Sequence, residues 1–126
     1  MQSLKRVLVV DDDDVCREAL SLCLQASGYE LTEASDGMDA LTRLQTGVYA
    51  LVITDYRMPG LNGIELLQII RKKWGTPVLL MSGNLDEGEE QVVGLYGARV
   101  LRKPIDRQTL LPLVKLAVTR GNAIDR

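Results

Sequence analysis

The sequence predicts an α/β fold in which five helices cover a doubly wound, five-stranded parallel sheet with the strand order 2-1-3-4-5. Short apolar runs alternate five times with helix-type patterns, and the length of 126 residues suits a single domain. Strict strand–helix alternation implies parallel strands joined by right-handed crossovers, which leaves few sheet orders. We therefore expect one domain over residues 1–126, with a frayed end at residues 121–126.

The expected strands are Arg6–Val10, Glu30–Ala34, Leu51–Thr54, Val78–Met81 and Val100–Arg102. The first, third and fourth are almost continuously apolar, as strands buried on both faces of a parallel sheet are. The second and fifth are more polar, so we expect them at the two edges of the sheet.

The expected helices are Val15–Ala26, Asp36 to about Gln45, a third with an apolar stripe over residues 64–70, Asp86–Tyr96, and Leu110–Val118. Gly28 and Gly47 provide natural stops after the first two. The fourth contains two glycines and several acidic residues, which predicts a mobile helix.

Composition and charge exclude several classes of partner. The chain has 15 basic and 17 acidic residues, a net charge of -2, and so lacks the basic excess that a nucleic-acid or membrane surface would require. Apolar runs such as Val7–Val10 are too short to span a bilayer, and the N-terminus carries no apolar signal-peptide run. A cytoplasmic protein without direct nucleic-acid or membrane contacts is expected.

The residue types also restrict the chemistry. Cys16 and Cys23 lie seven residues apart on one expected helix, too far for a disulfide, and are predicted to be small core residues. Histidine is absent, which removes the commonest metal ligand and the commonest general base. Any chemistry must therefore use carboxylates, hydroxyls, lysine and a metal.

Polar residues stand where the expected strands end. Asp11 and Asp12 follow the first strand, Asp55 the third, Ser82 the fourth and Lys103 the fifth. Ligands of open α/β sheets bind outside the carboxyl ends of the strands. Strands 1 and 3 would be neighbours in the expected order, so the three aspartates should converge there. Two carboxylates about 4 Å apart repel by about 4 kcal/mol at an effective dielectric constant of about 20, so such a cluster requires a cation.

Carboxylate oxygens favour a hard, octahedral ion, here Mg²⁺ or alternatively Mn²⁺. Lys103 and the hydroxyl of Ser82 would complete a phosphoryl-binding cradle around one nucleophilic carboxylate. Asp13 and Asp14 are instead expected to cap the first helix. Taken singly, Asp55 could be a turn residue, Lys103 a solvated lysine and Ser82 a helix cap, but their common position at strand ends favours a site.

These residues make the chain similar to the receiver domains of two-component response regulators along essentially its whole length. Residues 7–12 resemble the family's first strand with its acidic pair, and residues 52–60 resemble its phosphoacceptor segment. Asn62-Gly63 resembles the turn before its third helix, and residues 77–83 resemble the strand that ends in its switch hydroxyl. Lys103-Pro104 resembles its lysine with a cis-prone proline.

The resemblance implies a flavodoxin-like receiver fold and a specific chemistry. Asp55 would accept phosphate from a sensor histidine kinase, a histidine phosphotransfer protein or a small phosphodonor. Asp12, Asp55 and the backbone carbonyl of Arg57 would bind Mg²⁺ directly, and Asp11 would act through a bound water. Ser82 and Lys103 would contact phosphate oxygens.

The implied output is a signalling switch and not an enzyme that turns over many substrates. A surface around the fourth helix, fifth strand and fifth helix would be read by a protein target or a covalently linked output domain, and dimerisation is left open. The chain departs from the family at Val100, three residues before Lys103, where an aromatic residue is usual.

Three alternatives remain open at the level of sequence. Asp11–Val15 also fits the D-x-D-x-[T/V] signature of haloacid-dehalogenase-type phosphatases, with Asp11 as nucleophile and Asp13 as acid/base, although the later acidic motif and the cap insertion are missing. A flavodoxin-like mononucleotide binder would want a Ser/Thr/Gly-rich loop where this chain has four aspartates. A degenerate receiver acting only as a binding module is disfavoured because every charged site position is filled.

Overall fold

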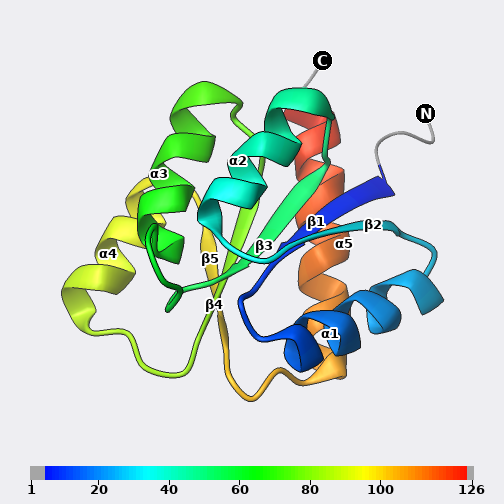
Figure 1. Cartoon of the computed structure of the whole chain (residues 1–126), viewed down its shortest axis with the longest axis horizontal. Coiled ribbons are helices and arrows are strands. Elements are labelled where there is room, and N and C mark those ends of the chain that lie inside the picture. Colours follow the sequence, from blue (N-terminus) through cyan, green and yellow to red (C-terminus); the bar gives the residue numbers. More distant parts are fainter. Residues whose placement is uncertain (1–4, 125–126) are drawn as a thin grey trace.

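The structure, a computed structural model, describes residues 5–124 (Figure 1). Its elements are β1 Arg6–Val10, α1 Asp14–Ala26, β2 Glu30–Ala34, α2 Gly37–Thr46, β3 Leu51–Asp55, α3 Gly63–Lys73, β4 Val78–Ser82, α4 Glu87–Leu95, β5 Arg99–Arg102 and α5 Arg107–Ile124. All strand pairs are parallel and the sheet order is β2-β1-β3-β4-β5, as predicted. The two more polar strands, β2 and β5, do lie at the edges.

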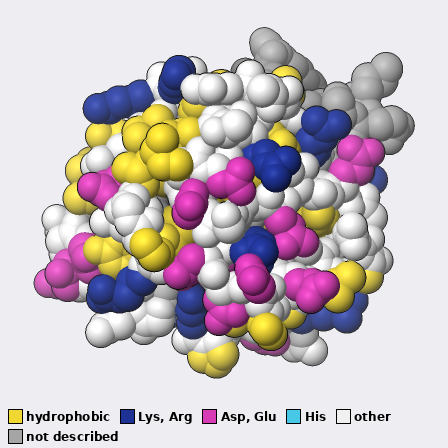
Figure 2. All heavy atoms as spheres, in the orientation of Figure 1, with side chains coloured by type: hydrophobic (Ala, Val, Ile, Leu, Met, Phe, Trp, Pro, Cys, Tyr) yellow, Lys and Arg dark blue, Asp and Glu magenta, His cyan; other side chains and the backbone are white. Residues whose placement is uncertain are grey.

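The sheet separates two hydrophobic layers. Alternate residues of its strands pack with α1 and α5 on one face, and the other alternation packs with α2, α3 and α4 (Figure 1). β3 and β4 are buried throughout, because both of their faces are covered by helices. Acidic and basic side chains are interspersed on the face shown in Figure 2, in keeping with the small net charge.

The pairing of β1 with β3 positions the candidate site. Val10 lies opposite Thr54, so the next residues, Asp11 and Asp55, leave the sheet side by side. Asp55 in turn lies opposite Met81 on β4, directly before Ser82. The functional positions of three strands therefore meet at one edge of the sheet.

Two local expectations differ from the structure. Cys16 is exposed and Cys23 only partly buried, so the prediction that both are core residues is wrong for Cys16. The buried residues of α1 are Leu20, Ser21 and Leu24, whereas Cys16 lies in the first turn, one turn before them.

The last helix begins earlier and ends later than the expected Leu110–Val118, because it runs over Arg107–Ile124 and includes Pro112. The expected frayed end overlaps its final turn, and residues 125–126 lie outside the described part of the chain. Among residues 5–124 we find no helix of the length and apolarity needed to cross a membrane.

Gly63 lets α3 begin directly behind the third strand. A Cβ atom there would lie 2.3 Å from the carbonyl oxygen of Asp55 and 2.6 Å from Cδ1 of Leu80. We predict that Gly63→Ala lowers the free energy of unfolding by about 1–3 kcal/mol or more, because backbone would have to move to relieve the overlap. Urea denaturation measures this difference.

Gly94→Ala is the matched control. Gly94 lies within α4, and a Cβ atom there would have no neighbour within 4 Å. The gain in helix propensity should therefore raise the free energy of unfolding by about 0.5–1 kcal/mol. Equal stabilities of the two variants would contradict the close approach at Gly63.

Candidate functional site

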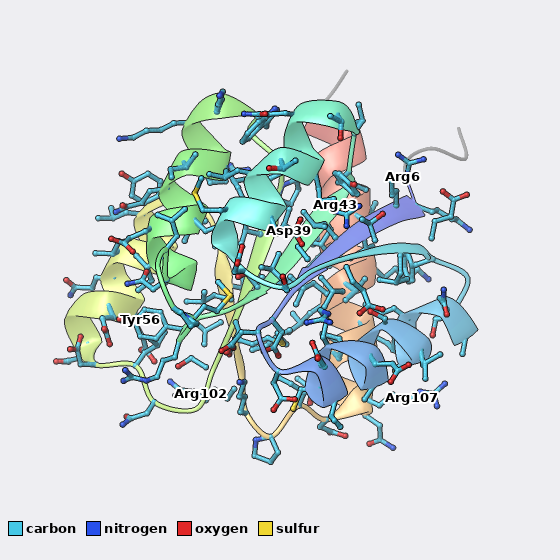
Figure 3. The ribbon with its side chains drawn as sticks, in the orientation of Figure 1. Arg6, Asp39, Arg43, Tyr56, Arg102 and Arg107 are labelled. Atoms are coloured by element: carbon cyan, nitrogen blue, oxygen red, sulfur yellow. The ribbon has the colours of Figure 1, made fainter. Side chains whose placement is uncertain are left out.

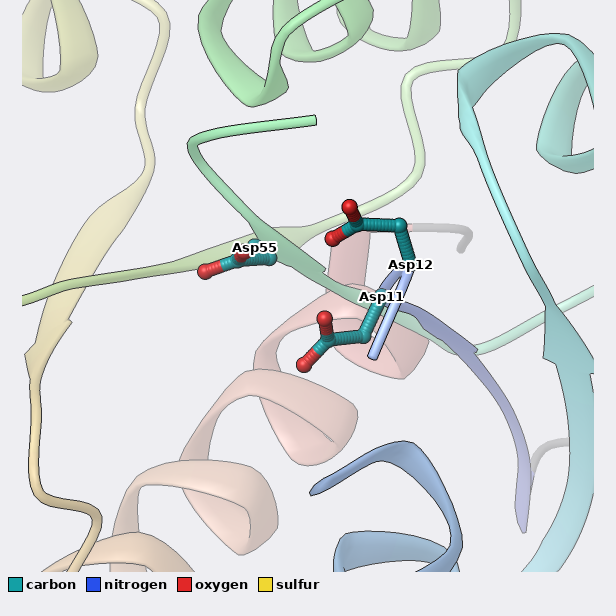
Figure 4. Close-up of side chains that lie close together, drawn as sticks. All are labelled: Asp11, Asp12 and Asp55. Atoms are coloured by element: carbon teal, nitrogen blue, oxygen red, sulfur yellow. The ribbon is translucent and has the colours of Figure 1, made fainter. Parts of the chain in front are cut away.

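Three carboxylates converge at the carboxyl edge of the sheet. One oxygen each of Asp11, Asp12 and Asp55 lie within 4.8 Å of one another (Figure 4). Asp11 and Asp55 are buried and Asp12 is exposed, so the cluster opens to solvent on one side. The predicted convergence of the two strand ends is confirmed.

Hydrogen bonds hold both the backbone and the carboxylate of Asp11. Its N–H donates to the carbonyl of Ala34 at 3.1 Å, and its carboxylate accepts the N–H of Asp13 at 3.0 Å. Burial raises the pKa of Asp11 above its ordinary value, and the neighbouring charge of Asp55 raises it further, against the lowering effect of the Asp13 N–H. The ionised cluster is therefore costly for this chain without a cation.

Arg17 on α1 binds the backbone of the same loop. Its Nη1 donates to the carbonyl of Asp11 at 2.7 Å, while Nε binds Glu33 at 2.9 Å and Nη2 binds Asp14 at 2.7 Å. This role was not predicted from the sequence. The Asp14–Arg17 spacing of one helical turn was the available signal, but nothing in the sequence placed Glu33 or the carbonyl within reach.

Lys103 supplies the countercharge. Its Nζ lies 2.6 Å from Oδ1 of Asp55, and its backbone N–H donates to the carbonyl of Ser82 at 3.0 Å. Burial opposes the charged form, but the hydrogen bond and charge of Asp55 outweigh it, so the pKa of Lys103 is raised. The Lys103–Pro104 peptide bond is cis, in line with the cis-prone proline of the resemblance.

Ser82 is buried at the end of β4. Its Oγ accepts the backbone N–H of Asn84 at 3.2 Å. The hydroxyl can rotate to another acceptor, since this bond uses only one of its lone pairs and leaves its proton available.

The segment after Asp55 is held by the neighbouring elements. The N–H of Tyr56 donates to the carbonyl of Met81 at 2.9 Å, and its own carbonyl accepts the N–H of Gly63 at 2.7 Å. Asn62 then caps α3, in a capping box with Glu65. Arg57 is exposed, and its guanidinium carbon lies 5.3 Å from the ring centroid of Tyr56.

Tyr56 also makes a contact that the sequence did not predict. Its hydroxyl donates to Oε2 of Glu89, in the first turn of α4, across 33 positions of sequence. Figure 3 shows Tyr56 on the side of the molecule where α4 lies. No periodicity or motif links these two residues, so only the folded structure reveals the pair.

Asp13 and Asp14 stand outside the cluster, as predicted. The side chain of Asp13 accepts the N–H groups of Val15 and Cys16 and caps α1, and Asp14 is the first residue of that helix. A carboxylate occupied by the helix cap is unsuited to the acid/base role that the phosphatase alternative requires of Asp13.

Fold and site together define a class: a doubly wound α/β domain with a lysine-countered acidic cluster at the carboxyl edge of its sheet. The chain belongs to the response regulator receiver domain family, whose model matches residues 7–115. It is thus a receiver domain of the two-component response-regulator type, and receiver domains are signalling switches. This membership favours the receiver interpretation over the phosphatase and mononucleotide-binder alternatives.

Known proteins support the assignment. The chain is 37% identical to the transcriptional regulatory protein CpxR homolog of Haemophilus influenzae over 94% of its own length and 52% of that protein. It resembles the structure of the chemotaxis protein CheY4 of Vibrio cholerae with a TM-score of 0.82 and 32% identity, covering 89% of this chain and 97% of that one. A response regulator receiver protein from Pseudomonas putida gives a TM-score of 0.83 and 36% identity, over 88% and 95% of the two chains. The chain spans about half the length of the curated relatives it matches.

Asp11 gives a pH-dependent prediction. An acid whose pKa is higher in the folded than in the unfolded state destabilises the fold as pH rises from its ordinary pKa of 3.8 through the folded pKa. Asn at this position can still accept the Asp13 N–H but carries no charge. Asp11→Asn should therefore raise the free energy of unfolding at pH 7, because the neutral amide does not carry the desolvation cost of a buried charge. The gain should shrink as pH falls toward about 4. Urea denaturation in the presence of a chelator measures both values, and a less stable variant at pH 7 would contradict the proposed cost of the buried charge.

Proposed function

We propose that the chain is a Mg²⁺-dependent phosphoacceptor, in which residues 1–126 form one receiver domain and Asp55 accepts the phosphoryl group. The observation that carries the proposal is the approach of Asp11 and Asp12 to Asp55, with Lys103 bound to the same carboxylate. Asp55 is the group that touches both the acidic cluster and the lysine.

The donor set fits Mg²⁺. Three carboxylate oxygens within 4.8 Å of one another offer hard ligands and a net negative charge that Lys103 only partly balances. Asp12, Asp55 and the backbone carbonyl of Arg57 would hold the ion directly, and Asp11 would hold it through a water; Mn²⁺ could replace Mg²⁺. The bound cation would supply positive charge for the phosphoryl oxygens.

The transfer uses groups already in place. An Oδ atom of Asp55 attacks phosphorus, and the bond from phosphorus to the donor breaks: P–N in a phosphohistidine, P–O in a small acyl phosphate. The electron pair leaves with the imidazole, which takes up a proton, or with the departing carboxylate. Lys103 then donates from its ammonium to a phosphoryl oxygen, and the Ser82 hydroxyl turns to donate to another.

The partners follow from this chemistry. Receiver domains pair with histidine kinases, so the phosphodonor is proposed to be a sensor histidine kinase or a histidine phosphotransfer protein. Some curated relatives, such as MtrA of Mycobacterium tuberculosis, are described as DNA-binding response regulators. We propose that the present domain does not bind nucleic acid or membrane itself, because its net charge is -2. It would act on a protein target or a linked output domain in the cytoplasm, as a switch and not a turnover enzyme.

Asp55→Asn tests the acceptor directly. An amide is a poor nucleophile, so the variant should take up less than about a hundredth of the label that the native chain takes from radiolabelled acetyl phosphate with Mg²⁺. Thermal unfolding of the variant should remain cooperative. Full labelling of Asp55→Asn would sink the proposal, and label located on Asp11 by mass spectrometry would favour phosphatase-type chemistry.

Asp12→Asn tests the metal site. Loss of a direct ligand should weaken Mg²⁺ binding more than about 10-fold, because even outer partners of metal ligands contribute that much. Glu87→Gln, the same loss of charge on an exposed residue outside the cluster, should leave the affinity within about 2-fold. Calorimetric titration gives both values, and equal affinities would place the ion elsewhere.

A further inference from the structure

Tyr56 connects the phosphoacceptor segment to the start of α4. It directly follows Asp55, and its backbone is held by hydrogen bonds to β4 and α3, from Tyr56 N–H to Met81 and from Gly63 N–H to Tyr56. Its hydroxyl donates to the carboxylate of Glu89. A side chain anchored at its base and bonded at its tip is a rigid link between two elements.

Glu89 also holds the N-terminal cap of α4. Its Oε1 accepts the N–H of Asp86 at 3.0 Å, and its own N–H donates to Oδ1 of Asp86 at 2.7 Å. Its other oxygen, Oε2, accepts the Tyr56 hydroxyl. One carboxylate therefore closes the capping box and binds Tyr56, so the cap cannot shift away from the third strand while both bonds persist.

The charges favour a strong bond at this position. Glu89 lies in the first turn of α4, where the helix dipole favours an ionised carboxylate. The phenol is thus the donor to an ionised carboxylate, which is a charge-assisted bond.

The cap lies only a few residues after the switch hydroxyl. Ser82 accepts the Asn84 N–H, and Asp86 is the residue that caps α4. If the Oγ atom of Ser82 itself moves toward a phosphoryl group on Asp55, the Asn84 N–H must follow it or lose this bond, so the loop from Ser82 to Asp86 would adjust. The Tyr56–Glu89 bond resists that adjustment at its far end.

We propose that Tyr56 is a positioning residue that holds the start of α4 in the unphosphorylated arrangement and thereby lowers the affinity of Asp55 for a phosphoryl group. The inference rests on the proposed function of Asp55. In this proposal the loop after β3 restrains α4 through the Tyr56 hydroxyl. The side chain of Val100 on β5 has no donor or acceptor and cannot form such a bond.

Linkage fixes the direction of the effect. If the Tyr56–Glu89 bond is present only in the unphosphorylated arrangement, it lowers the affinity of Asp55 for a phosphoryl group. By linkage, a bound phosphoryl group lowers the stability of the bond by the same free energy. Removing the hydroxyl should therefore tighten binding. For a partly exposed charge-assisted bond we expect a gain of about 5-fold.

The test compares the same substitution at two tyrosines. Tyr56 contacts the first turn of α4, and Tyr96 is the C-terminal cap of α4. Tyr56→Phe removes the bonded hydroxyl; Tyr96→Phe, at the C-terminal cap, removes one that makes no hydrogen bond to the residues that the structure describes. The probe is beryllium fluoride with Mg²⁺, a phosphoryl analogue, titrated by NMR. Tyr56→Phe should bind it about 5-fold more tightly than the native chain, whereas Tyr96→Phe should match the native chain within about 2-fold.

A second arm asks whether Glu89 is the partner. In a Glu89→Ala background, which removes the acceptor of the Tyr56 hydroxyl, Tyr56→Phe should change the affinity by less than about 2-fold, because two changes in one bond do not add. In the absence of the analogue, the amide shifts of Asp86 and Glu89 should move in Tyr56→Phe. A purely structural role of Tyr56 would change stability without tightening binding.

The outcomes separate the two proposals. Unchanged or weaker binding by Tyr56→Phe, or a full effect of about 5-fold retained in the Glu89→Ala background, would overturn the role of Tyr56 while leaving the proposed role of Asp55 intact. Failure of the native chain to bind the analogue with Mg²⁺, or equal binding by Asp55→Asn, would instead overturn the proposed function.

Discussion

The register between β1 and β3 is the constraint on which the site depends. Because Val10 lies opposite Thr54, Asp11 and Asp55 leave the sheet from adjacent positions, and the pairing of the two strands keeps their backbones together. The residues that hold this register, such as Leu8, Val52 and Ile53, are fully buried. The hydrophobic core thus forces like charges together, and the resulting repulsion is the source of the demand for a cation.

Two cationic side chains lie next to the acidic cluster and bind different parts of it. Lys103 binds the Asp55 carboxylate itself, whereas Arg17 binds the carbonyl of Asp11 and carries its own acidic partners, Glu33 and Asp14. In the proposed function, Lys103 would therefore contact a phosphoryl group placed on its own partner, Asp55. Arg17, with three acceptors on three segments, is suited to hold the loop still.

Strand periodicity and strand order made most of the fold and the acidic cluster predictable from the sequence. Apolar runs located the strands, polarity located the edges, and the strand ends brought the three aspartates, Ser82 and Lys103 to one side. The exposure of Cys16 was not predictable, because the helical pattern of α1 has apolar residues on more than one face and several of them, including Val15 and Leu22, remain exposed. The roles of Arg17 and Tyr56 were not predictable either, because their partners are set by side-chain reach between elements and not by spacing along the chain.

The acidic run at the start of α4 shows why that limitation matters. As a pattern, Glu87, Glu89 and Glu90 resemble a solvated helix face with a favourable dipole. In the structure, Glu89 binds Tyr56, the residue next to Asp55, and Glu90 pairs with Arg102 on β5. The first turn of α4 is therefore tied to both the third strand's loop and the edge strand. A shift of this turn would alter both contacts at once, so under the proposed role of Tyr56 a phosphoryl group on Asp55 would also act on the edge strand through Arg102.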